Sequence, residues 1–76
     1  MSEKELMEMF ADNLQAELED AQMTINELAE ESGVSRTNIH YYLHGERIPS
    51  LKNLMNIMVA LDCEFYDLID EHAHID

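Results

Sequence analysis

The chain has 76 residues and a formal net charge of −13 at pH 7, with no tryptophan and a single cysteine. This length allows one small hydrophobic core, so we expect a single domain over residues 1–76. No apolar run approaches the roughly 20 residues of a membrane span, and the first residues are charged where a secretory signal would be apolar, so a cytoplasmic protein without membrane contact is expected.

The sequence has no feature of the common catalytic sites. It contains no glycine-rich phosphate loop, no nucleophile elbow and no zinc-protease motif. A chain of this size has little room for the roughly several hundred cubic ångströms of a substrate pocket. The lone thiol, Cys63, is expected to be a small buried hydrophobe rather than a nucleophile. We therefore expect a protein that is not an enzyme and needs no cofactor.

A long helix is expected at the start of the chain. Ser2 with Glu5 three residues later has the form of a capping box, in which each side chain accepts a hydrogen bond from the other residue's backbone N–H. From Leu6 onward one face of this helix is apolar except at Asn13 and Glu17. The residues of this face that are expected in the core are Phe10, Leu14 and Leu18.

Two short helices are expected over residues 24–43. Thr24 and Glu27 form a second capping box, and Gly33 is suited to the left-handed conformation that ends a helix. Ser35 is the N-cap candidate of the next helix. A separation this short, containing a glycine, favours helices that cross steeply. The residues expected to face the core are Ile25, Leu28, Ala29, Val34, Ile39, Tyr42 and Leu43.

Two more helices are expected in the remainder. Ser50 is the N-cap candidate of the fourth helix, which Asp62 and Cys63 end, and residues 64–69 form a short fifth helix. The residues expected to face the core here are Ile48, Leu51, Leu54, Met55, Met58, Leu61, Phe65, Leu68 and Ile69.

The charges are distributed unevenly. Residues 32–61 hold Arg36, Arg47 and Lys52 against a single acid, whereas residues 1–31 and 62–76 hold the other sixteen acids and one lysine. Basic residues supply the phosphate contacts of DNA-binding proteins, and a net negative chain is repelled by DNA as a whole. The segregation therefore favours one DNA-facing side on an otherwise acidic molecule.

The four histidines occur in two pairs with spacings that can bind a metal ion. His40 and His44 lie one helical turn apart, and His72 and His74 form a short cluster near the end. No cysteine pair or neighbouring carboxylate completes either set, so no metal site is predicted. Protonation of His40 and His44 would add positive charge beside the third helix, so DNA binding that strengthens as pH falls is a hypothesis for this pair.

The segment ELAEESGVSRTNIHYYLHGERIPS, residues 27–50, resembles the helix-turn-helix of the phage Cro and repressor class of transcription regulators. The resemblance extends over about residues 13–69, with the helix-turn-helix at 24–43. It implies an all-α, five-helix fold like that of lambda repressor, here with an extended first helix. The residues that carry the resemblance are Ala29, Gly33, Val34, Ile39, Gly45, Pro49 and Ser50.

The resemblance implies that residues 35–43 read the major groove of a double-stranded operator with palindromic half-sites. By position, the base-contacting residues are Arg36, Thr37 and Tyr41, and an arginine such as Arg36 can donate twice to guanine O6 and N7. The residues expected to contact the DNA backbone are Ser35, Asn38, Arg47, Ser50 and Lys52.

The family often dimerises through its C-terminal region, which implies a homodimer through Phe65, Tyr66 and Ile69. One alternative function stays open. The first helix lacks the arginine or lysine that the family normally places between Asn13 and Leu18. This departure favours an acidic protein-interaction module on the same fold: an antirepressor or DNA mimic that binds a basic protein partner, or a regulator of a DNA-binding protein.

Overall fold

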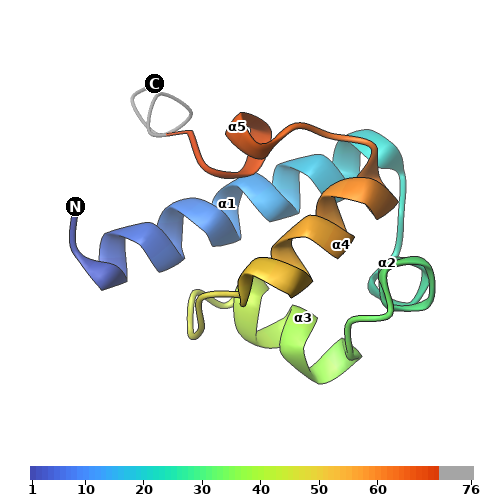
Figure 1. Ribbon diagram of the computed structural model, residues 1–76, viewed down its shortest axis with the longest axis horizontal. Helices are drawn as coiled ribbons and strands as arrows, with labels where there is room; N and C mark the ends of the chain where they lie inside the picture. Colours follow the sequence, from blue (N-terminus) through green and yellow to red (C-terminus); the bar gives the residue numbers. More distant parts are fainter. Residues whose placement is uncertain (71–76) are drawn as a thin grey trace.

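The chain folds into five α-helices in the computed structural model, which describes residues 1–70. α1 packs against α3, α4 and α5, and α2 packs against α3 and α4 (Figure 1). Residues 1–70 contain no strand, so the predicted all-α class with a long first helix is confirmed. His72 and His74 lie outside the described residues. The helices are α1 (Glu3–Ala21), α2 (Ile25–Ser32), α3 (Arg36–Leu43), α4 (Leu51–Leu61) and α5 (Phe65–Leu68).

The predicted helix starts are confirmed. Ser2, Thr24, Ser35 and Ser50 are the N-caps of the first four helices, and each hydroxyl accepts a backbone hydrogen bond three residues later. Gly33 ends α2 in the left-handed region, at φ 76°, where glycine has no steric penalty. Among residues 1–70 no helix is both long and apolar enough to cross a membrane.

The capping boxes of α1 and α2 lower the pKa of their glutamates. The backbone N–H of Ser2 donates to Glu5 at 3.0 Å, and that of Thr24 donates to Glu27 at 2.9 Å. These hydrogen bonds, followed by those to the Ser2 and Thr24 side chains, stabilise the ionised carboxylates. A carboxyl with a lowered pKa stabilises the fold above its ordinary pKa and loses this contribution as pH falls.

The core lies between α1 on one side and α2, α3 and α4 on the other. Phe10 of α1 and Tyr42 of α3 meet edge to face, with ring centroids 5.8 Å apart. Leu14, Leu28 and Ile39 are fully buried around them. The remaining members of this cluster are Leu18, Val34, Leu54, Ile57, Leu61 and Leu68.

The structure corrects four expected core positions, two of them because α4 is rotated relative to the predicted stripe. Leu54, Ile57 and Leu61 face the core at helical spacing, which turns Leu51 and Met55 into solvent. The exposed residues that were expected inside are Ile48 (42% exposed), Leu51 (75%), Met55 (50%) and Phe65 (49%). Ile48 precedes the helix, and Phe65 is the first residue of α5, so neither is held on an inward face by a preceding turn.

Two asparagine side chains tie helices together. The buried Asn13 Nδ2 donates to the carbonyl of Leu68 at 2.8 Å, which joins α1 to the end of α5. Asn53 Nδ2 donates to the hydroxyl of Tyr42 at 3.0 Å, which joins the first turn of α4 to α3. The second bond fixes the start of α4 beside α3, where the predicted DNA contacts lie.

Candidate nucleic-acid interface

α3 presents a polar face to solvent because its apolar face is held in the core. Ile39 and Tyr42 are buried, whereas Arg36, Thr37 and His40 are exposed. The helix lies along the lower edge of the view in Figure 1. Three side chains of different chemistry are therefore available to an external ligand on one helix.

Arg36 is joined to α2 across the helix-turn-helix. Its Nη1 donates to Asn26 Oδ1 at 3.1 Å, and both residues are exposed. An open cleft of about 490 Å³ runs between the starts of α2 and α3 beside this pair. Its lining residues are Thr24, Ile25, Asn26, Arg36, Thr37 and His40.

Arg47 lies in the loop between α3 and α4, and this loop returns its side chain to α3. The guanidinium carbon lies 4.1 Å from the centre of the half-buried Tyr41 ring, a cation–π contact. Gly45 shapes this loop at φ 68°, and a Cβ there would lie 3.7 Å from the backbone oxygen of Met7 in α1. Tyr41 and Arg47, predicted to serve base and backbone contacts separately, thus form one unit.

The predicted phosphate contacts lie at helix starts. The hydroxyl of Ser35 accepts from Asn38 N–H, and that of Ser50 accepts from Asn53 N–H, each at 3.1 Å. Both hydroxyls keep a proton to donate, and the first-turn N–H groups of α3 and α4 carry the positive end of the helix dipole. Lys52 is exposed in the first turn of α4.

The histidine pair lies beside this face. The rings of His40 and His44 stack with centroids 6.1 Å apart, and His44 Nδ1 lies 3.5 Å from Glu46 Oε1. Both rings are exposed.

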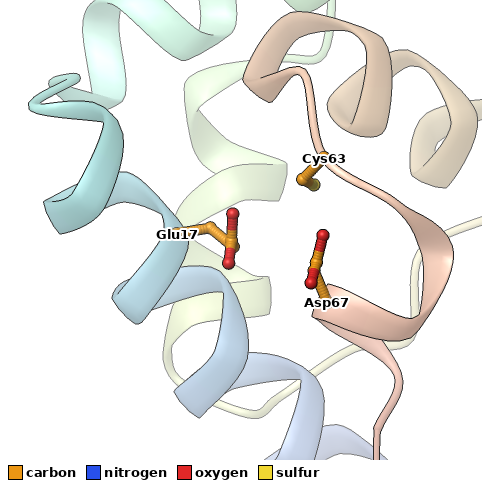
Figure 2. A group of neighbouring side chains, drawn as sticks. All are labelled: Glu17, Cys63 and Asp67. Atoms are coloured by element: carbon orange, nitrogen blue, oxygen red, sulfur yellow. The ribbon is translucent and has the colours of Figure 1, made fainter.

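A second polar cluster, missed by the sequence analysis, lies between α1 and α5. Figure 2 shows Glu17, Cys63 and Asp67 converging from α1, the α4–α5 connection and α5, with ligand atoms within 4.8 Å of one another. Glu17 is 46 positions from Cys63 and 50 from Asp67, so helix periodicity carries no signal that α1 brings Glu17 to this pair.

Burial first, then the charges of Asp67 and Asp20, raise the pKa of Glu17. Burial and the neighbouring carboxylates, with Glu17 first among them, raise the pKa of Cys63 to about 11, so the thiol stays protonated at neutral pH. The cluster is therefore a site of electrostatic repulsion between α1 and α5.

Replacing Glu17 with glutamine is expected to raise the melting temperature at pH 7. A carboxyl whose pKa is raised by folding opposes folding once it is ionised, so its unfavourable contribution grows as pH rises through the ordinary glutamate pKa of about 4.3. Thermal unfolding at pH 7 and at pH 4 measures this. Glu19→Gln, an exposed residue on the same helix, removes the same net charge, and an equal gain in both variants would contradict the repulsion.

Comparison with known proteins agrees with this geometry. The family model described as a Cro/C1-type HTH DNA-binding domain matches residues 13–71. The crystal structure of the restriction-modification controller protein C.AhdI from Aeromonas hydrophila is similar, with a TM-score of 0.77 and 27% identity over 82% of this chain and 94% of that one. No curated protein matches the sequence significantly. The chain therefore belongs to the Cro/C1-type helix-turn-helix family of DNA-binding regulators.

Proposed function

We propose that the protein is a sequence-specific transcription regulator of the phage repressor and Cro type, which reads the major groove of its operator with residues 35–43. The exposed face of α3 carries this proposal, because Arg36 and Thr37 point outward while Ile39 and Tyr42 fix the helix from behind. A B-DNA major groove admits an α-helix, and Arg36 has the donors that match guanine O6 and N7. Thr37 and the edge of Tyr41 are the proposed additional base contacts.

The backbone contacts are proposed for the edges of the same surface. Arg47, held on Tyr41, and Lys52, in the first turn of α4, supply positive charge. Ser35, Asn38 and Ser50 supply neutral donors at the helix starts. Together these groups fix register without reading sequence. The similarity to a restriction-modification controller protein supports a role in gene control of this kind.

The net charge of −13 does not prevent this binding. The molecule extends over 31 × 21 × 18 Å, and charges in physiological salt are screened over about 8 Å. A phosphate near Arg36 or Arg47 therefore senses the nearby cations more strongly than acids on the far side of the molecule. The overall charge weakens long-range attraction and slows association.

We propose that the protein binds as a homodimer through its C-terminal region. Phe65 and Tyr66 are 49% and 63% exposed, and Ile69 is half-buried beside them. α4 adds an exposed apolar stripe of Leu51, Met55 and Val59. A dimer with two-fold symmetry would place two copies of α3 about 34 Å apart, on successive turns of a palindromic site.

The outer face of α1 favours a second candidate function, an acidic module that binds a basic protein. This face carries many exposed carboxylates, and basic residues are absent from it after Lys4. Its exposed acids are Glu3, Glu5, Glu8, Asp12, Glu19 and Asp20. DNA binding and binding of a basic protein through α1 use different surfaces, so one experiment separates them.

The experiment is enrichment of bound duplexes from a random pool at low salt, followed by affinity measurements at increasing salt. The regulator should enrich a palindromic sequence. The logarithm of its affinity should fall with the logarithm of the salt concentration at a shallow slope of about −2 to −3 per protomer. The slope is shallow because this surface has three basic side chains, those of Arg36, Arg47 and Lys52. Enrichment of no sequence, with no duplex bound even at low salt, would reject the regulator and favour the acidic module.

A further inference from the structure

Resting on the proposed function, we propose that Asn26 is a specificity-determining positioning residue, which holds the guanidinium of Arg36 in the orientation that reads a base. The contact is the 3.1 Å hydrogen bond from Arg36 Nη1 to Asn26 Oδ1. It joins residues ten positions apart on the two helices of the helix-turn-helix. Asn26 does not contact the base in this account, and it acts through Arg36.

The hydrogen-bond partner of Arg36 is the neutral side chain of Asn26, although α2, the helix that carries Asn26, is rich in carboxylates. α2 carries Glu27, Glu30 and Glu31, all exposed, yet no ion pair joins any of them to Arg36 within residues 1–70. A carboxylate partner would cancel the charge of Arg36 and repel phosphate. An amide oxygen orients the guanidinium and leaves its full positive charge to the DNA.

The bond leaves the reading edge of the arginine intact. A guanidinium has donors on Nε and on both Nη atoms, and Asn26 uses one donor of Nη1. The edge formed by Nη2 and Nε is still complete for a bidentate contact to guanine O6 and N7. The Asn26 bond therefore does not have to break when Arg36 reads a base.

Asn26 is held on a rigid support. It is the second residue of α2 and lies between Thr24 and Glu27, the two residues of the capping box that fixes the start of that helix. Leu28, two residues further along α2, is fully buried and anchors the helix in the core. Asn26 and Arg36 also border an open surface on the α2 side. Arg36 is thus bordered by open space and is confined in orientation by Asn26.

The test is a double-mutant cycle on duplexes, with thermal unfolding to confirm that each variant is folded. Wild type, Asn26→Ala, Arg36→Ala and the double variant are titrated with the enriched duplex and with one in which the base pair assigned to Arg36 is replaced. Asn56→Ala is the matched control, since Asn56 lies on α4 and makes no hydrogen bond within residues 1–70 except those of its backbone. Asn26→Asp adds a carboxylate at the same place.

Asn26→Ala should weaken binding of the enriched duplex about three- to tenfold, the cost of ordering one long side chain on binding, with little change on the replaced duplex. It should have no further effect when Arg36 is already alanine. Asn26→Asp should weaken binding of both duplexes, because it cancels charge. Asn56→Ala should behave as wild type.

The outcomes separate this inference from the proposed function. If Arg36→Ala removes base preference and Asn26→Ala does not alter it, the regulator stands and the positioning role is wrong. If wild type shows no base preference, or if Arg36→Ala leaves that preference unchanged, both the proposed base contact of Arg36 and the positioning role of Asn26 are wrong. Guanidinium NMR of the free protein tests the contact without DNA: rotation of the Arg36 Nε–Cζ bond should be slower in wild type than in Asn26→Ala, and equal rates would overturn the inference.

Discussion

Phe10→Ala is expected to lower the free energy of unfolding by about 3–5 kcal/mol, the largest loss of any single substitution proposed for this chain. Phe10 is 1% exposed and meets Tyr42 edge to face, so alanine removes the ring contact between α1 and α3 and leaves a cavity. A folded chain of this length has a total stability of roughly 4–11 kcal/mol. The loss is therefore a large fraction of the total, and the unfolded fraction at 37 °C is expected to rise.

Urea unfolding followed by circular dichroism measures this loss. Phe10→Leu is the control, because it keeps most of the volume and is expected to cost about 1 kcal/mol. DNA binding should weaken in parallel with the folded fraction, since Tyr42 holds α3 in place. A loss below about 1 kcal/mol in Phe10→Ala would show that the α1–α3 contact does not organise the core.

Arg36→Ala and Lys52→Ala are expected to weaken DNA binding in two different ways. Arg36→Ala should cost about 1–3 kcal/mol on the enriched duplex and relax preference at one base position, because it removes a bidentate base contact. Lys52→Ala should weaken all duplexes alike and make the salt slope shallower by about 1 per protomer, because it removes a phosphate contact. Affinity measured on a set of single-base variants at two salt concentrations separates the two patterns.

Lys4→Ala is the matched control for charge. Lys4 is exposed in the first turn of α1, so its removal changes the net charge equally, outside the proposed surface. It should change affinity by less than a few tenths of a kcal/mol. Three variants with equal losses would mean that net charge alone governs binding, and the assignment of Arg36 to a base would fail.

Helix boundaries could be predicted from the sequence because they depend on local chemistry. Four helices begin at a serine or threonine whose hydroxyl accepts a hydrogen bond from the backbone N–H three residues later, a spacing that can be read in the sequence. These N-caps are Ser2, Thr24, Ser35 and Ser50. The predicted end of α4 at Asp62 is confirmed. Gln22 and Asp62 end α1 and α4 in the left-handed region at φ 53°, although glycine is the residue best suited to that conformation.

The facing of α4 could not be predicted, because several apolar stripes fit this helix. Leu51, Met55 and Val59 form one stripe, and Leu54, Ile57 and Leu61 form another. Periodicity alone does not choose between them, and packing against α2 selected the second. The rejected stripe is the exposed apolar surface now proposed to contribute to dimerisation.

The sequence could predict which residues of the candidate site lie on the exposed side of α3. It could not predict which side chains of the site contact one another. The helix-turn-helix pattern fixed which side of α3 faces out, and this placed Arg36 and Thr37 on the surface. The bond of Arg36 to Asn26 and the stacking of Arg47 on Tyr41 depend on side-chain geometry across a turn. No sequence spacing encodes those contacts, so their part in recognition had to be inferred from the structure.

Amide NMR during titration with the enriched duplex tests the central claim most directly. If a locally cationic face binds DNA on an acidic protein, the perturbed amides should lie in residues 35–52 and at the start of α2, and those on the outer face of α1 should be unchanged. Perturbations that lie mainly along α1, with α3 unaffected, would contradict the claim.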